Sequence, residues 1–183
     1  MTGGPGDRDA FWALLEAAGE AARWDAEGVA DDLVCRLREL PVAELVAFDA
    51  VLRALLAESR RRDLWAAAHL INGGRSDGAF PAFQGWLLAQ GRRVYEAALR
   101  DPDSLAEHPP VRDRPAADPR APVLASGEML DVAERAYEHA TAGTGAPPLD
   151  SLRPPGEPDE PLGADDPEEL RGRLPRLWAL GRG

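Results

Sequence analysis

The chain has 183 residues, of which 32 are acidic and 21 basic, so its formal charge at pH 7 is −11. All the basic residues are Arg, and the absence of Lys excludes a GxxxxGK phosphate-binding loop and a Schiff-base enzyme, which both need an amine side chain. A single Cys excludes an internal disulfide and any zinc or iron–sulfur site that is built from several Cys. We therefore expect no cofactor. The acidic excess also predicts that nucleic acid is not a partner, because its phosphates attract basic surfaces.

The length favours one domain with its own hydrophobic core. Residues 1–9 combine charges with turn-forming residues, where a signal peptide would be apolar. The longest uncharged run, residues 78–91, is shorter than the roughly 20 apolar residues that a membrane span needs. We therefore expect a cytoplasmic protein without a membrane partner, and the sequence leaves its oligomeric state undetermined.

The first 107 residues repeat apolar side chains three or four positions apart, which is the spacing of one buried helix face. A short Ala-rich helix is also predicted over residues 63–72 and ends at Gly73-Gly74. Pro41 ends one predicted helix and is placed as the first residue of the next, and Gly91 interrupts the later helical pattern. The run 60–62 is three Arg, which fit a helix C-terminus or, alternatively, a ligand-binding patch. The apolar stripes are Phe11, Leu14, Leu15, Ala18 and Ala22; Val29, Leu33, Leu37 and Leu40; Leu45, Phe48, Leu52 and Leu55; Phe80, Phe83, Trp86 and Leu87; and Val94, Tyr95, Ala98 and Leu99.

The amino-acid composition changes after residue 107. Residues 109–122 contain five Pro and are predicted to be a non-helical, extended strap within a connector, 108–125. One more helix is predicted over 126–142, followed by a solvated acidic loop at 143–166 and a docking C-terminal helix at 167–180 that bends at Pro175. No stretch alternates as a strand does. The sequence thus predicts an all-α, single compact domain of about seven to eight helices, with 1–107 as its helical core and Pro-rich connectors.

The segment 72–78 is the most distinctive local sequence, with two Gly followed by Arg75, Ser76 and Asp77. A Gly-rich loop that feeds a helix N-terminus can bind an anion, and Arg75 would supply the matching charge. The alternative is structural, because two Gly can end one helix while Ser76 or Asp77 caps the next.

Histidine and carboxylate spacing predicts no metal site, because His69 has no acid or His one helical turn away. His69 follows Trp65 by four residues, so the two side chains share a helix face. We interpret His69 as a core histidine bonded to a carbonyl, and a general base is the alternative.

Several motifs together resemble the uncharacterised bacterial domain-of-unknown-function family 4240. The residues that carry the resemblance are Phe11-Trp12, Leu64 to Ala68, Gly73-Gly74, Ser76-Asp77, Phe80, Phe83, Gly85 to Leu87, Gln90 to Arg92, Asp101 to Leu105, Glu128 to Leu130, Ala136 to Glu138 and Leu174 to Leu177. The resemblance covers nearly the whole chain and implies one domain, but no known activity. The family pattern places a second acid where this chain has Gly78 and an Arg where it has Gln84. Both departures remove a charged side chain from the same region, next to the segment 72–78. In the family pattern the acid and the Arg would form either a structural salt bridge or a polar site.

Two functional hypotheses follow. The first is a protein-interaction, regulatory or immunity-type accessory, in which the acidic surface and a local excess of aromatic residues meet a protein partner. The alternative is a small-ligand-binding protein or enzyme with a pocket between the helices that flank Gly73-Gly74. No catalytic residues can be assigned, and the sequence favours a role without catalysis. The candidate pocket or interaction corner consists of Trp65, His69, Asn72, Arg75, Asp77, Gln84, Trp86 and Arg92.

Overall fold

The computed structural model describes residues 7–73, 80–113, 123–154 and 166–180. All regular structure in these ranges is helical, which confirms the all-α class, and eight of the helices have seven or more residues. None of the helices in these ranges is both long and apolar enough to cross a lipid bilayer. The elements in chain order are α1 (Arg8–Ala21), α2 (Ala26–Leu37), α3 (Val42–Glu58), α4 (Arg62–Ile71), α5 (Phe80–Ala89), α6 (Arg92–Arg100), the 3₁₀ helix η1 (Pro102–Glu107), α7 (Pro109–Arg112), the 3₁₀ helix η2 (Glu128–Leu130), α8 (Val132–Thr141), the 3₁₀ helix η3 (Leu149–Leu152), α9 (Pro167–Arg173) and α10 (Pro175–Ala179).

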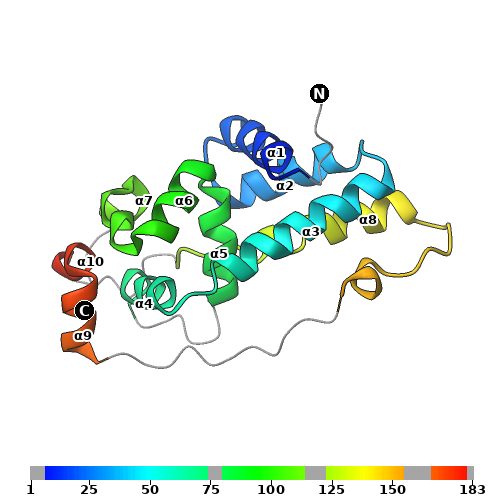
Figure 1. Cartoon of the computed structure of the whole chain (residues 1–183). Helices are drawn as coiled ribbons and strands as arrows, with labels where there is room; N and C mark the ends of the chain where they lie inside the picture. The colour runs from blue at the N-terminus through cyan, green and yellow to red at the C-terminus, as the bar shows by residue number, and fades with distance from the viewer. Residues whose placement is uncertain (1–6, 74–79, 114–122, 155–165, 181–183) are drawn as a thin grey trace.

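Helices α1 and α2 begin at carboxylate caps and pack against each other (Figure 1). The side chain of Asp7 accepts a hydrogen bond from the Asp9 N–H at 3.1 Å, and Asp25 accepts one from the Gly28 N–H at 3.0 Å. Such caps satisfy N–H groups that a helix leaves without partners at its start. The acids at these two positions therefore fix where both helices begin.

Helix α3 is the longest helix of the described chain and runs through the middle of the molecule, beside α8 (Figure 1). Its predicted stripe of Leu45, Phe48, Leu52 and Leu55 is buried, as the helical spacing requires. These side chains belong to a hydrophobic core cluster that extends from α1 to α10. Pro41 immediately precedes α3 as its N-cap residue, whereas the sequence placed it as the first helical residue.

The next helices follow the predicted order. The segment 74–79, where Ser76 or Asp77 was expected to cap a helix, lies outside the described residues. Gly91, with φ of +87°, makes the turn between α5 and α6. The Tyr95 hydroxyl of α6 donates a hydrogen bond to the Leu55 carbonyl at 2.6 Å and so joins α6 to α3. At the end of α3 the Arg61 Nε donates to the Glu58 carbonyl at 3.0 Å, which is the helix-end role predicted for this Arg run.

The structure corrects the predicted strap at its start. Residues Pro109–Arg112 form α7, although the Pro content predicted no helix there. The two prolines occupy the first two helical positions, where no backbone N–H is needed and the fixed φ of Pro suits a helix. Val111 is completely buried and anchors this turn to the core. The remaining segment 114–122 lies outside the described residues.

In three further segments the observed helices differ from the predicted ones in their number or their bounds. Residues 126–142 form two helices, η2 and α8, and the Ser126 hydroxyl caps the first by accepting the Met129 N–H at 3.3 Å. The predicted loop 143–166 includes η3, because the buried Leu149 provides an apolar anchor within an otherwise polar stretch. The predicted C-terminal helix is divided into α9 and α10 at Leu174, next to Pro175, where the sequence placed a bend.

Candidate functional site

The residues predicted to form one pocket are placed in several different environments. Arg75 and Asp77, like Gly78, lie outside the described residues. Trp65 and His69 stack on each other with their ring centroids 5.4 Å apart. His69 Nδ1 is buried and has no hydrogen-bond partner among the described residues, so the expected bond to a carbonyl is not seen at this atom.

The amide side chains of this set join separate elements. Asn72 pairs with the backbone of Leu124 in both directions, donating to its carbonyl at 3.3 Å and accepting its N–H at 2.9 Å. Gln84 is buried in α5 and donates to the Leu56 carbonyl at 2.7 Å and to the Ser59 hydroxyl at 2.8 Å. Gln84 therefore connects α5 to the end of α3, which is a structural role for this departure from the family pattern.

Trp86 and Arg92 point to other neighbours. Trp86 packs against Phe83 and against the edge of His108, at centroid distances of 5.4 and 5.9 Å. Arg92 lies at the start of α6 and pairs with Glu96 at 2.7 Å and with Asp9 of α1 at 2.6 Å. The hydrogen bonds that Arg92 donates to Glu96 and then to Asp9 raise the pKa of Arg92 above its ordinary value. Of the predicted residues that the structure describes, Trp65 and His69 are thus the pair that it brings together.

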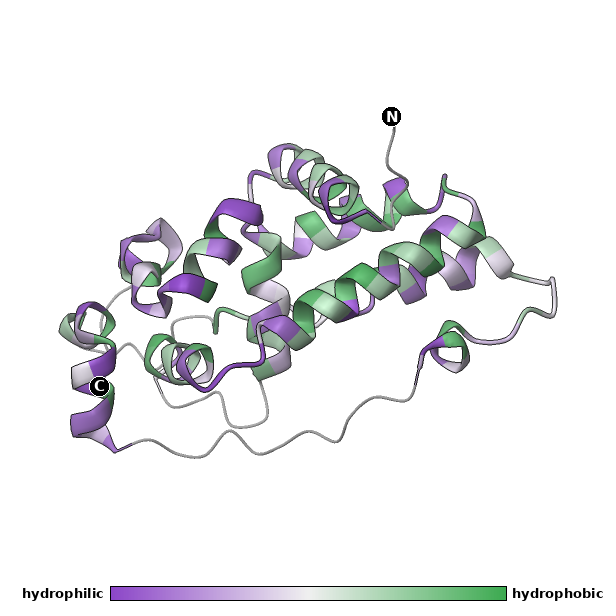
Figure 2. Cartoon of the chain, viewed as in Figure 1, coloured by the Kyte–Doolittle hydropathy of each residue, from purple (hydrophilic) through white to green (hydrophobic). Residues whose placement is uncertain are grey.

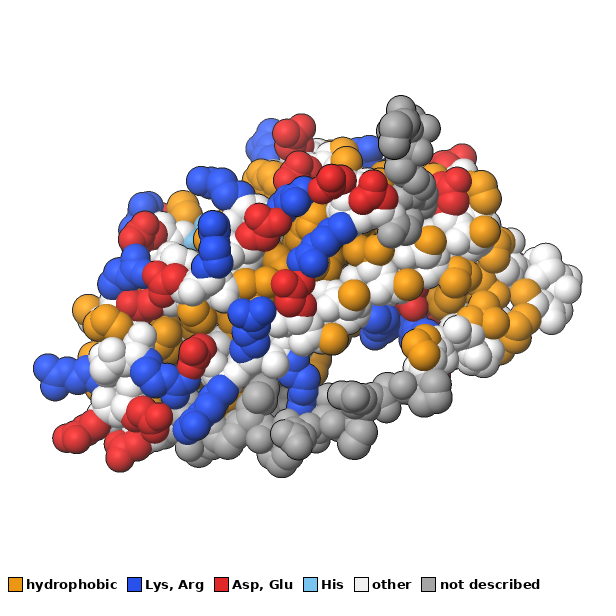
Figure 3. All heavy atoms as spheres, viewed as in Figure 1, with side chains coloured by type: hydrophobic (Ala, Val, Ile, Leu, Met, Phe, Trp, Pro, Cys, Tyr) orange, Lys and Arg blue, Asp and Glu red, His pale blue; other side chains and the backbone are white. Residues whose placement is uncertain are grey.

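A different surface stands out on α3. Five alanines follow one another at intervals of four, three, four and three residues, so they form a single stripe along the helix. This Ala stripe faces away from the buried leucine stripe, and four of its members are exposed while Ala47 is half-buried. Figure 2 shows how hydrophobic α3 is along its length, and Figure 3 shows apolar atoms in the middle of this face with charged side chains around them. The members of the Ala stripe are Ala43, Ala47, Ala50, Ala54 and Ala57.

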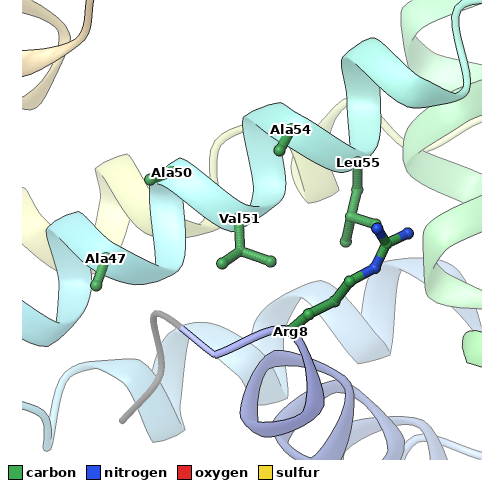
Figure 4. Close-up of a pocket in the computed structure, with 6 residues that line it drawn as sticks. All are labelled: Arg8, Ala47, Ala50, Val51, Ala54 and Leu55. Carbon is green, nitrogen blue, oxygen red and sulfur yellow. The ribbon is translucent and has the colours of Figure 1, made fainter.

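A hollow of about 460 Å³ lies on one side of the Ala stripe. Figure 4 shows its wall, in which Val51 and Leu55 stand beside the alanines of α3 and the long Arg8 side chain reaches over from α1. The Arg8 guanidinium bonds to Glu58 of α3 at 2.5 Å, and both side chains are partly exposed. This first groove is therefore apolar along its floor and charged at one end.

A second groove, of about 690 Å³, lies on the other side of the Ala stripe, between α3 and η3. Ala50 and Ala54 line both grooves, so the stripe forms the ridge between them. Leu152, an exposed apolar side chain of η3, stands at the second groove. The residues that line it are Val46, Asp49, Ala50, Arg53, Ala54, Ala57, Leu149, Asp150, Leu152, Arg153 and Pro154.

A buried carboxylate with two outer arginines defines the electrostatics of the second groove. The Asp49 side chain is only 4% exposed, and Arg153 binds both of its oxygens, at 2.8 and 3.0 Å. Arg53 reaches the same carboxylate at 3.4 Å and donates to the Leu130 carbonyl at 3.2 Å. Hydrogen bonding of Arg153 to the Asp49 carboxylate is the main reason that the pKa of Arg153 is raised. Arg153 also pairs with Asp150, which is 76% exposed, at 2.8 Å. Arg53 is 38% exposed above the buried Asp49, so it is the side chain that presents positive charge to the solvent in this part of the groove.

The sequence of α3 contains a signal for this surface in addition to its buried stripe. Helix α3 has a second periodic stripe, made of small residues, opposite its buried one, and a helix that is apolar on more than one face has a second face to cover. The side of the second groove that η3 forms could not be predicted in this way, because Asp49 and Arg153, which pair there, are 104 residues apart in sequence. Within the described residues, no group of three His, Cys, Asp or Glu side chains is placed to hold a metal ion.

Comparison with protein families finds a match that covers most of the chain. A family model described as "Protein of unknown function (DUF4240)" matches residues 7–139, a range that includes α1 to α7 and most of α8. The C-terminal residues that carried part of the resemblance, Leu174 to Leu177, fall outside this range. No curated protein and no solved structure matches the chain. Because the match covers most of the chain, this protein belongs to the DUF4240 family.

Proposed function

We propose that this protein acts through contacts with another protein, and that the Ala stripe of α3 with its two grooves is the docking surface. The proposed occupant is an amphipathic α-helix of a partner protein, which carries acidic side chains next to its apolar stripe. The observation that carries the proposal is the Ala stripe itself, exposed between two grooves that share Ala50 and Ala54.

The spacing of the Ala stripe suits a second helix. Small side chains let two helix backbones approach closely, and side chains of one helix then fill hollows on the other. The 4-3-4-3 interval is the one that keeps a seam facing a neighbouring helix over several turns. The two grooves supply the hollows, because each runs beside the ridge of Ala50 and Ala54. A partner helix would thus place larger apolar side chains on both sides of the ridge.

The charges next to the ridge favour an acidic flank on that helix. Arg8 stands at the first groove, where it pairs with the partly exposed Glu58, and Arg153 at the second groove pairs with the exposed Asp150 as well as with Asp49. Arg53 stands at the second groove with its carboxylate partner, Asp49, buried, so it is the arginine that a partner carboxylate would meet. The overall charge of −11 does not decide the contact, because charges farther away than about 10 Å are largely screened in salt. A carboxylate on the partner would meet Arg53 at contact distance, where the interaction is strongest.

The groove between α3 and η3 also supports a second candidate function, the binding of a small apolar molecule with an anionic group. Its volume of about 690 Å³ and its mostly apolar wall, with two arginines and two aspartates of which Asp49 is buried, are typical of small-molecule sites. Thermal melting of the protein with a panel of fatty acids and aromatic carboxylates tests this candidate. A rise in melting temperature that Arg53→Ala removes would favour small-molecule binding. No rise with any compound of the panel would reject it.

Site-specific photo-crosslinking tests the docking surface directly. A benzoylphenylalanine replaces Ala54 in the ridge, or Ala13 as a matched control, since Ala13 is an exposed alanine on α1. The full chain is irradiated in source-cell lysate, and the crosslinked peptide is sequenced by mass spectrometry. We expect one adduct from position 54 that position 13 does not give, attached to a segment with an apolar heptad stripe and acidic flanks. The same adducts from both positions, or an adduct between two copies of this chain, would overturn the proposal.

A further inference from the structure

The C-terminal arm, residues 166–180 with α9 and α10, packs against α4 and η1 at one end of the molecule (Figure 1). It lies outside the range that the family model matches. Residues 155–165, which connect it to η3, lie outside the described residues. The arm thus lies beyond the matched range and packs against α4 and η1, which lie within it.

The docking of the arm depends on one buried carboxylate of η1. Asp103 accepts the backbone N–H of Arg176 on Oδ2 and that of Leu177 on Oδ1, both at 2.9 Å. These are the first backbone N–H groups of α10, because Pro175 has none. A helix start is usually capped by a side chain just before it. Here the cap is supplied by Asp103 of η1, more than 70 residues away in the sequence.

The side chain of Arg176 adds a second recognition element. Its Nε bonds to Asp103 at 3.1 Å, its Nη1 bonds to Glu107 at 2.7 Å, and its Nη2 bonds to Asp101. Hydrogen bonding to Asp103 is the main reason that the pKa of Arg176 is raised. The flat guanidinium fork has donors in the directions that three carboxylates can use together, which a lysine ammonium cannot reproduce.

Apolar anchors complete the contact. Leu174 and Leu177, which flank Pro175 and Arg176, are 2% and 0% exposed, and Leu170 of α9 is also buried. The bound pattern is thus an apolar residue, a helix-starting proline, an arginine and a second apolar residue. By contrast, α9 is joined to α4 by ion pairs among partly exposed side chains, such as Arg62 with Glu169 at 3.8 Å, and such surface pairs contribute little. The specific part of the docking is concentrated at Leu174 to Leu177.

We propose that η1 provides a peptide-binding site for a Leu-Pro-Arg-Leu helix start, which the C-terminal arm fills within its own chain. The ligand class is a segment of a partner protein with the same pattern, which displaces the arm. Asp103 caps its first turn, Asp101 and Glu107 bind its arginine, and the sites of Leu174 and Leu177 bind its apolar residues. Because the arm is tethered, it competes with an effective concentration on the order of millimolar. A free peptide therefore binds well only when the arm is weakened or the peptide is abundant.

A fluorescein-labelled peptide of residues 166–180 is the probe, titrated with the full chain and followed by fluorescence anisotropy. Arg176→Ala in the chain weakens the tethered arm but leaves the η1 site intact, so we expect the probe to bind at least tenfold more tightly than to the unmodified chain. Arg171→Ala, at an exposed arginine of α9, is the matched control and should leave probe binding unchanged. Equal probe affinity for the unmodified and the Arg176→Ala chains would overturn the proposal.

Two site variants, each made in the Arg176→Ala chain, show where the probe binds. Asp103→Asn should weaken probe binding at least tenfold. Glu107→Gln, at a side chain that is 76% exposed and so does not threaten folding, should weaken it about threefold. A second probe that carries Ala in place of its arginine should bind weakly and should not respond to Glu107→Gln. Probe binding that is indifferent to Glu107→Gln would overturn the arginine assignment, and dimers formed by exchange of arms between copies would overturn the assignment to a partner protein.

Discussion

At the scale of single residues, the turn between α1 and α2 is held in an uncommon conformation. Arg23 and Trp24 both have positive φ, of 54° and 63°, which few residues other than Gly adopt. The Trp24 ring lies directly over Gly19 of α1 and Gly91 of the α5–α6 turn, so that a Cβ on either glycine would come within 3 Å of it. Sequence periodicity cannot show this arrangement, because it depends on a side chain that inserts between glycines 72 residues apart.

The first prediction separates this contact from helix propensity. Gly19→Ala removes a flexible residue from the interior of α1, and propensity alone predicts a gain of about 1 kcal/mol. We expect a loss of unfolding free energy instead, because the new methyl group displaces the Trp24 ring. In a Trp24→Ala chain the same change should stabilise. Urea unfolding of the four chains in this double-mutant cycle measures the four unfolding free energies. A higher unfolding free energy for Gly19→Ala with Trp24 present would contradict a tight contact between Trp24 and Gly19.

Tyr95 gives the second prediction, which concerns pH. Burial, and next the negative charge of Glu58, raise the pKa of the Tyr95 hydroxyl above its ordinary value of 10.0. The unfolded chain then ionises this group at a lower pH than the folded chain, so the stabilisation is complete below pH 10 and is lost as the pH rises above it. Because the chain has no Lys, few other side chains ionise in this range.

The measurement is the unfolding free energy at intervals from pH 8 to 12. We expect the wild-type value to fall above pH 10 by up to about 1.4 kcal/mol per pH unit from this one group. Tyr95→Phe should cost about 1 kcal/mol near neutrality, from the hydrogen bond to Leu55, and should flatten the alkaline decline. Parallel declines in the two proteins would show that Tyr95 is not its source.

At the scale of elements, the sequence predicted helices where a repeating apolar stripe was sufficient. The stripes of α1, α2 and α3 are read from residues three and four positions apart, and most of their residues are buried as predicted, while Leu14, Ala22 and Leu40 are partly buried. Elements that depend on distant partners were missed. Helix α7 begins with two prolines and is stabilised by Val111, and η3 is fixed by the pairing of Arg153 with Asp49. Neither contact is visible in a local window of the sequence.

The third prediction tests the attachment of η3. Arg153→Ala leaves the buried Asp49 with only its longer contact to Arg53, and we expect a loss of about 3 kcal/mol in unfolding free energy. Hydrogen exchange in residues 148–154 should also become faster. The control is Asp150→Ala, which removes a partner of Arg153 that is 76% exposed and should cost less than about 1 kcal/mol. Equal losses from both variants would mean that the buried pair does not hold η3.

At the scale of the whole molecule, the candidate site divides into a part that sequence could predict and a part that it could not. Asn72, Gln84 and Trp86 were predicted as members of one candidate pocket or interaction corner, and each makes a defined contact, but with a different part of the chain. The 3-4 spacing of the Ala stripe can be read in the sequence of α3. That it remains uncovered, with a groove on each side, depends on how α1 and η3 pack beside it. Composition gave the all-Arg charge pattern, whereas the fold decided which arginines stand beside exposed apolar surface.

The most direct test of the docking surface is a calorimetric titration of this protein with the partner found by crosslinking at position 54. Ala54→Arg places a long charged side chain on the ridge between the two grooves, and Ala13→Arg places the same side chain on α1 as a control. Both positions are exposed, so both variants should keep the helical circular dichroism of the wild type. We predict a dissociation constant at least tenfold higher for Ala54→Arg and unchanged for Ala13→Arg. Equal affinity of the wild type and Ala54→Arg would contradict the assignment of the α3 face as the docking surface.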